Sequence, residues 1–268
     1  MKQSKRKIID VHAHIFPEKI REKAVEAIGE FYSAPMQRKG SPDDLLTYRE
    51  KAGIDYFVVH SVATAPKQVL HINDFIHAQT QEHPELIAFA TLHPKMDCLA
   101  DEIERVIQLG FSGIKLHPDF QQFDIDAPEA QQLYALVDNR LPILLHMGDA
   151  HKTFSHPKRL ARMVEKFPGQ VFIGAHFGGY NAWDDAETYL IGKTNIYIDT
   201  SSSLFAISPE RARAMIERHG VDKVLFGTDY PMWDPAEELK RFLQIPLSEE
   251  ERAAILYENT AKLLKLEV

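Results

Sequence analysis

The sequence contains a single cysteine, Cys98, among its 268 residues, so no disulfide can form within the chain. One unpaired thiol is typical of a protein from a reducing compartment. No apolar run approaches the roughly 18 residues that a membrane span needs. The segment after the basic start MKQSKRK is interrupted by Asp10, His12 and His14, which argues against a signal peptide. We therefore expect a cytoplasmic protein that does not bind a membrane.

Basic residues are also fewer than acidic ones, with 31 lysine and arginine residues against 39 aspartate and glutamate residues. The formal net charge of −8 argues against nucleic acid or an anionic membrane surface as the main partner. The apolar share of 44% is that of an ordinary globular protein. A small-molecule substrate is the expected partner, and a homodimer formed through apolar outer helices is an open alternative.

Short β-rich runs alternate with amphipathic segments along the whole chain, a pattern that favours strands joined by crossover helices. Most of the runs are almost continuously apolar, as expected of parallel strands that are buried on both faces. Eight such runs are present, at 8–14, 54–60, 86–93, 112–117, 142–147, 171–176, 195–200 and 223–229.

The number of strand–helix units predicts one domain over residues 1–268, a distorted (β/α)8 TIM barrel. Helix starts are marked by a Ser-Pro pair at Ser41 and at Ser208 and by prolines at 128, 157 and 235. The first unit is the longest, so we expect an extra loop at 31–40 after the first strand. The segment 248–266 is expected to be a closing amphipathic helix. The alternative, an open doubly wound sheet, lacks its Gly-rich phosphate loop here.

Polar side chains recur at the expected carboxyl ends of the strands, which meet at one mouth in such a barrel. Alternation on the first strand places His12 and His14 on one face. Together with His146 and Asp229 they make a set of three nitrogens and one oxygen that suits Zn²⁺ and could take Mn²⁺ or Fe²⁺. The competing interpretation is that these are ordinary buried histidines. The strand-end residues are His12, His14, His60, His93, Lys115, His117, His146, His176, Asp199 and Asp229.

The ordered motifs resemble the amidohydrolase superfamily, near the branch of aminocarboxymuconate-semialdehyde decarboxylase and the amidohydrolase-related TIM-barrel hydrolases. The resemblance rests on DVHAH at 10–14, on His146, on GAH at 174–176, on FGTD at 226–229 and on the closing YENTAKLL. It implies His12, His14, His146 and Asp229 as metal ligands. It implies His176 as either the acid/base group beside a metal-bound water or a ligand of a second metal.

Two residues on the fourth strand bear on metal number and substrate binding. The resemblance implies that a carboxylated Lys115 would bridge two metals, whereas a free Lys115 amine would bind a substrate carboxylate as a point charge. Lys115 and His117 share one face of that strand, so we expect both to contact the substrate, with a single metal favoured. Asp10 either orients a ligand histidine or is a buried acid held by backbone amides.

The preferred hypothesis is a metal-dependent hydrolase of a small amide, lactone or ester. Its metal-activated water would lose a proton to Asp229 while His176 polarises or protonates the substrate. The alternative is a non-oxidative decarboxylase of an aromatic or muconate-like acid, in which His176 assists protonation of the carbon that loses CO₂. A non-catalytic barrel scaffold is the third alternative.

Overall fold

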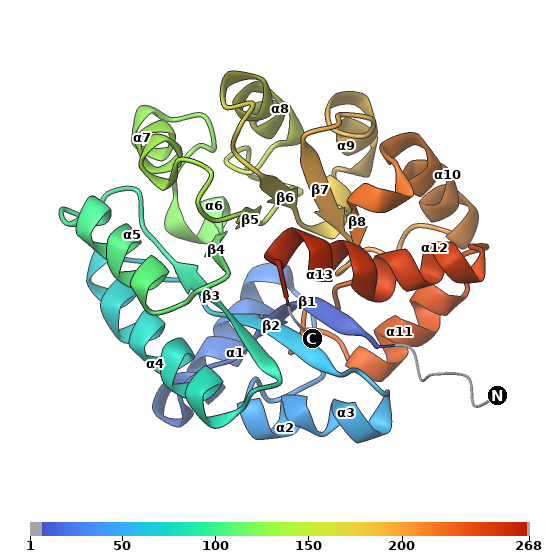
Figure 1. Ribbon diagram of the computed structural model, residues 1–268, viewed down its shortest axis with the longest axis horizontal. Helices are drawn as coiled ribbons and strands as arrows, with labels where there is room; N and C mark the ends of the chain where they lie inside the picture. The colour runs from blue at the N-terminus through green and yellow to red at the C-terminus, as the bar shows by residue number, and fades with distance from the viewer. Residues whose placement is uncertain (1–6, 267–268) are drawn as a thin grey trace.

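The computed structural model describes residues 7–266 as eight parallel strands in the order β1 to β8, with helices outside them (Figure 1). This confirms the predicted (β/α)8 barrel, and every predicted run contains a strand. The strands are β1 (Ile9–His14), β2 (Tyr56–His60), β3 (Leu86–Thr91), β4 (Gly113–Leu116), β5 (Ile143–Leu145), β6 (Phe172–Gly174), β7 (Ile196–Asp199) and β8 (Val224–Leu225).

Backbone hydrogen bonds between β1 and the residues after β8 close the cylinder. Val11 N–H donates to the carbonyl of Phe226 at 2.9 Å, and Asp229 N–H donates to the carbonyl of His12 at 2.8 Å. Asp10 strengthens this junction, because its carboxylate accepts from the backbone N–H of His12 and of Thr228, each at 3.0 Å. Asp10 is therefore the buried acid held by backbone amides.

The helices begin where the proline and serine signals predict. Ser41 and Ser208 cap their helices by accepting from the backbone N–H of Asp44 and Arg211, both at 3.2 Å, and a proline follows each cap. The helices are α1 (Glu18–Tyr32), α2 (Pro42–Leu46), α3 (Tyr48–Lys51), α4 (Val69–Glu82), α5 (Leu99–Gln108), α6 (Pro118–Gln121), α7 (Pro128–Val137), α8 (Pro157–Lys166), α9 (Trp183–Tyr189), α10 (Pro209–His219), α11 (Pro235–Leu243), α12 (Glu249–Ala253) and α13 (Asn259–Leu264).

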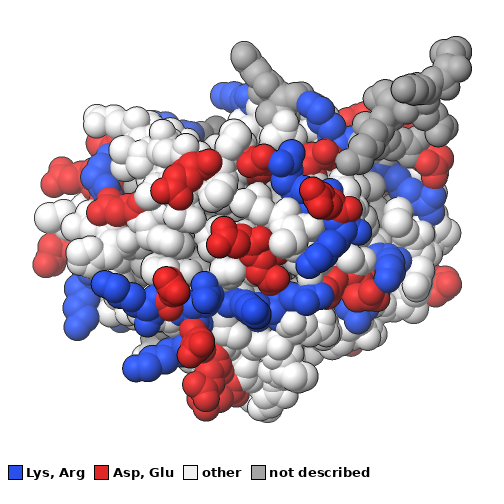
Figure 2. All heavy atoms as spheres, turned by 90° about the horizontal axis from the view of Figure 1, so that it is seen from below, with Lys and Arg blue, Asp and Glu red and all other residues white. Residues whose placement is uncertain are grey.

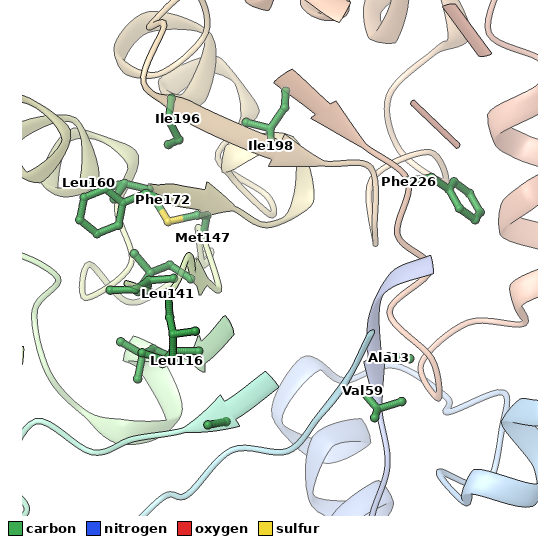
Figure 3. Packing of buried hydrophobic residues seen from close by; sticks show 14 of the residues in the cluster. Ala13, Val59, Leu116, Leu141, Met147, Leu160, Phe172, Ile196, Ile198 and Phe226 are labelled. Carbon is green, nitrogen blue, oxygen red and sulfur yellow. The ribbon is translucent and has the colours of Figure 1, made fainter. Parts of the chain in front are cut away.

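Two apolar layers hold the fold together. The outer layer joins strand residues such as Leu116 and Phe172 with helix residues such as Leu160, which lies beside Phe172 in Figure 3. The inner layer fills the barrel with alternate strand residues, including Val58 and Leu144. Each strand therefore buries both of its faces, which explains why the runs are almost continuously apolar.

The chain after β8 closes the barrel at the end opposite the strand carboxyl termini. α12 continues through a π-helical turn, Ala254–Glu258, into α13. Ala261, Leu263 and Leu264 pack on the inner layer beside Tyr56 and Tyr197, which lie near the amino-terminal ends of their strands. Figure 1 shows α13 across this end of the barrel. The predicted closing helix is thus present, and it leaves the other mouth free for a site.

The extra length of the first unit is mostly helix. Phe31 and Tyr32, expected in the loop, form the end of α1, and the connecting loop runs from 33 to 41. Gln37 and Arg38 in this loop donate backbone hydrogen bonds to the carbonyls of Met232 and Pro231 at 3.3 and 3.0 Å. These bonds tie the loop to the segment after β8, beside the mouth of the barrel.

The surface is charged and mixed in sign. Acidic and basic side chains are interspersed over the face shown in Figure 2. None of the helices formed by residues 7–266 is both long enough and apolar enough to cross a membrane.

Candidate metal centre

The candidate centre lies at the carboxyl ends of the strands, where inward-facing positions change from apolar to polar. Along β2 the inner-layer Val58 is followed two residues later by His60, and along β5 Leu144 is followed by His146. The strand period of two keeps these side chains inside the barrel. One pocket, with a volume of about 340 Å³, is lined by most of the predicted site residues, namely His12, His14, His117, His146, His176 and Asp229.

His12, His14 and Asp229 present three donor atoms to one point. Nε2 of His12 lies 3.4 Å from Oδ1 of Asp229, and Nε2 of His14 lies 3.5 Å from the same oxygen. Two ligands of a tetrahedral ion with bonds of about 2.1 Å lie roughly 3.4 Å apart, so these spacings fit a divalent metal. Burial by itself raises the pKa of Asp229, but the electrostatic interaction with His12 and the hydrogen bond of His14 outweigh it and hold that pKa well below its usual value.

A buried carboxylate fixes the tautomer of His12. Nδ1 of His12 lies 2.8 Å from Oδ2 of Asp199, and a carboxylate can only accept, so Nδ1 carries the proton. Nε2 of the neutral ring therefore keeps its lone pair on the side of Asp229. Burial lowers the pKa of His12 to about 4, with a further contribution from the Lys115 charge, so the ring is neutral near pH 7. A carboxylate behind a ligand histidine is a common arrangement in metal sites.

His146 and His176 face each other with two lone pairs. Nδ1 of His176 lies 3.1 Å from the carbonyl of Ser201, and Nε2 of His146 lies 2.9 Å from the carbonyl of Gly148. Carbonyls accept only, so these nitrogens are protonated and the opposite ones are not. The opposite nitrogens, Nε2 of His176 and Nδ1 of His146, lie 3.0 Å apart. Two lone pairs at this distance need a proton or a cation between them.

A further imidazole, His60, is buried beside these residues. Its ring lies 4.4 Å from the ring of His14 and 5.0 Å from that of His12, measured between centroids. Among the residues that the structure describes, neither ring nitrogen of His60 has a hydrogen-bond partner. Buried polar atoms are rarely left without a partner. His60, His12 and His14 each offer one nitrogen within 4.8 Å of the others. The chemistry and spacing of this donor set fit a divalent metal ion.

Two of these side chains are carried on strained backbone. His176 and Asp229 both have a φ of 62°, in the left-handed region that non-glycine residues rarely occupy. Such a conformation costs about 1–2 kcal/mol per residue. Strain of this kind gathers at functional sites, where the surrounding structure holds a side chain in a required direction. Both residues end short motifs, GAH and FGTD, that the sequence analysis singled out.

Lys115 contacts the nitrogen of His12 that faces Asp229, and it is not among the residues that line the pocket. Its Nζ is 2.9 Å from Nε2 of His12, and the side chain is completely buried. Burial lowers the pKa of the amine to about 8, although the charges of Asp229 and Asp199 oppose this shift. The amine contacts His12 directly. Its contact with a substrate, which the sequence predicted, stays a prediction.

His117 does line the pocket, where it meets a residue that the sequence analysis missed. Nδ1 of His117 accepts from the backbone N–H of Phe120 at 3.3 Å, so the neutral ring is protonated at Nε2. That Nε2–H donates to the hydroxyl oxygen of Tyr32 at 2.8 Å. The hydroxyl hydrogen of Tyr32 is then free to point to a ligand. Tyr32 ends α1, and no local pattern marks a single tyrosine on a half-exposed helix as a pocket residue.

Asp199 and Ser201 form the second group whose role the sequence did not reveal. Oδ1 of Asp199 accepts from the backbone N–H of His176 and of Ser201, both at 3.0 Å. The Ser201 hydroxyl contacts Nδ1 of His12 at 3.0 Å and Nδ1 of His176 at 2.9 Å. Asp199 was recognised as a strand-end acid, but its histidine partner is 187 positions away in sequence.

A family model described as amidohydrolase matches residues 9–266. The chain belongs to the amidohydrolase family. This confirms the resemblance found in the motifs and supports a metal-dependent enzyme of the superfamily, a hydrolase or a carboxy-lyase. Among curated proteins, no sequence matches this chain.

Solved structures similar to this chain include several decarboxylases. An uncharacterised TIM-barrel protein from Bordetella bronchiseptica has a TM-score of 0.79 at 18% identity, with 97% of this chain and 98% of that chain covered. Dihydroxybenzoic acid decarboxylase from Polaromonas sp. JS666, with bound manganese and the inhibitor 2-nitroresorcinol, has a TM-score of 0.76 at 18% identity, with 98% of each covered. 5-Carboxyvanillate decarboxylase from Sphingomonas paucimobilis has a TM-score of 0.72 at 17% identity, with 97% and 99% covered. At these identities the likeness shows the fold.

Proposed function

We propose that this amidohydrolase is a non-oxidative, metal-dependent decarboxylase of an aromatic acid. The similar structures with a named activity favour this alternative over the hydrolase hypothesis. The observation that carries the proposal is the likeness to solved decarboxylases over at least 97% of this chain. Asp229 suits either reaction, because its Oδ1 faces His12 and His14 while its Oδ2, which accepts a hydrogen bond from the Ser202 hydroxyl, keeps a second lone pair.

In this proposal His12, His14, His146 and Asp229 hold one divalent ion, Zn²⁺ or Mn²⁺. Both ions accept imidazole nitrogen and carboxylate oxygen, so the donor set does not separate them. When bound, the ion supplies positive charge that attracts the carboxylate and any neighbouring hydroxyl oxygen of the substrate. His117 and Tyr32 orient the substrate from the wall of the pocket, and the Lys115 cation adds attraction for an anion.

His176 is the proposed proton donor. Burial lowers the pKa of His176, so a protonated ring gives up its proton readily. The proton forms a bond to the ring carbon that carries the carboxylate. The bond from that carbon to the carboxylate then breaks, its electron pair returns to the ring, and CO₂ leaves. One proton from solvent restores His176 in each cycle.

The proposal is tested by product analysis on protein loaded separately with Zn²⁺ and with Mn²⁺. A panel of hydroxylated benzoates and of lactones is incubated, and CO₂ release is measured against acid release. We expect CO₂ from at least one benzoate and none from Asp229→Asn protein that retains its circular dichroism spectrum. Lactone hydrolysis without CO₂ release from any acid would restore the hydrolase hypothesis and overturn the proposal.

A further inference from the structure

A large apolar groove leads away from the metal centre beneath α1. Its volume is about 1370 Å³ and that of the pocket over the centre about 340 Å³, both counting the part open to solvent. His14, Ile28 and Phe120 line both, so the two spaces are adjacent. The enclosed space is about 550 Å³ for the groove, within the usual 300–1,000 Å³ of small-ligand pockets, and only about 20 Å³ over the centre, so the groove supplies most of the room for a ligand.

The face of α1 that lines this groove is not buried by other parts of the protein. No residue of α1, all of which the structure describes, is buried. The side chains that it turns to the groove include Ile20, which is 47% exposed, together with Ala24 and Ile28. A surface helix normally buries an apolar stripe against the core. Here that stripe faces a space that lies beside the metal centre, so an apolar ligand would bury it.

A buried carboxylate without a partner lies on the wall of the same groove. Asp119 is 1% exposed, and within the described part of the chain neither of its oxygens has a hydrogen-bond partner. Nε2 of His146 lies 3.8 Å away, beyond hydrogen-bond distance. Burial raises the pKa of Asp119, and the neighbouring Ser155 hydroxyl, which likewise has no partner by strict geometry among the described residues, acts to lower it. By contrast, the Thr64 hydroxyl on the same groove donates to Gln68 Oε1 at 3.1 Å. One serine hydroxyl can serve only one of the two oxygens, so Asp119 keeps an oxygen for a donor from a ligand.

We propose that the groove beneath α1 binds an elongated substrate, an aromatic acid with an apolar substituent that carries a hydroxyl or amino donor. The acid head occupies the metal centre, the donor meets Asp119 where the two spaces adjoin, and the apolar part lies under α1. The assignment of the head group rests on the proposed function. The groove, its apolar helix face and the partnerless Asp119 are independent of the reaction.

The first test is calorimetric titration of the zinc-loaded full chain with 4-alkyl-2-hydroxybenzoates whose chains have one to six carbons. Affinity should rise by roughly two- to fourfold for each methylene that the groove buries. Ala24→Phe, which fills the groove, should abolish this gain and leave the one-carbon ligand unaffected. Glu26→Phe on another side of α1 is the matched control and should keep the gain. Affinity independent of chain length, or no binding by any member, overturns the inference.

The second test isolates Asp119. Wild-type protein should bind a ligand with a 4-hydroxymethyl group about tenfold more tightly than its 4-ethyl counterpart, and Asp119→Leu should remove or reverse this preference while remaining folded by circular dichroism. An unchanged preference in the variant would refute the role of Asp119. If the variant does not fold, Asp119→Asn is used, and the same loss of preference is required.

These titrations measure binding, so they separate the groove from the reaction. Binding that tightens with chain length, without CO₂ release from any ligand, would support the groove as a binding site and contradict the decarboxylase proposal. CO₂ release from short acids, with no effect of chain length on affinity, would support the decarboxylase proposal and contradict the groove as a binding site.

Discussion

Asp199 offers the sharpest test of the metal centre, because its replacement by asparagine changes one atom and predicts a specific failure. Oδ1 of Asp199 accepts from the backbone N–H of His176 and of Ser201, so the asparagine carbonyl must take that place. The new amide NH₂ then faces Nδ1 of His12, 2.8 Å away in the wild type. His12 must move its proton to Nε2, the atom that faces Asp229. A protonated Nε2 cannot bind a metal.

The magnitude follows from what such carboxylates contribute elsewhere. Loss of the group that orients a ligand histidine typically lowers metal affinity by about 10- to 100-fold, which is about 1.4–2.7 kcal/mol. The charge lost is fully buried. Burial alone raises the pKa of Asp199, but the charge and hydrogen bond of His12 hold it below its usual value, so wild-type Asp199 is ionised. The loss of zinc affinity in Asp199→Asn should therefore be at least as large above pH 5 as it is at pH 5.

The assay is competition for Zn²⁺ between the protein and a fluorescent chelator of known affinity. Asp222→Asn is the control. Asp222 is an exposed acid whose carboxylate lies 3.2 Å from Lys223 Nζ, and it is not one of the residues of the candidate centre. Thermal melts and circular dichroism report whether each variant is folded. Zinc affinity of folded Asp199→Asn within twofold of wild type would refute the tautomer argument and with it the assignment of His12 as a ligand.

Three other perturbations give independent outcomes. Removing metal with a chelator should lower the melting temperature, because an ion at 100 times its Kd stabilises the fold by about 2.7 kcal/mol; an unchanged melt argues against a specific ion. The buried Lys115 amine has a pKa of about 8 in place of 10.5, so metal-free protein at pH 7 carries a cost of about 3 kcal/mol that disappears as pH rises from 8 towards 10.5. Lys115→Met should therefore stabilise metal-free protein at pH 7 and less so at pH 10, as denaturant midpoints would show. Tyr32→Phe removes a pocket donor and should raise KM about tenfold with kcat nearly unchanged, the loss expected of one hydrogen bond to an anion; an unchanged KM would remove Tyr32 from substrate binding.

The barrel and the histidine positions could be predicted because both depend on local period. A strand buried on both faces is apolar throughout, and its inward side chains recur every second residue, so the eight runs and the pairing of His12 with His14 are visible in sequence. Helix starts were equally local, since Ser41 and Ser208 cap the turn that directly follows them.

Contacts between residues that are distant in sequence are set by the closure of the barrel. The Asp199 carboxylate behind His12, the Lys115 amine on the same ring and the facing pair of His146 and His176 link different strands. No periodicity encodes such a pairing, because it depends on which strand ends meet across the barrel and on the tautomers that their neighbours impose. Tyr32 lines the pocket because α1, which lies in the connection between β1 and β2, ends beside the mouth of the barrel. The groove beneath α1 likewise exists only where that helix meets the rim.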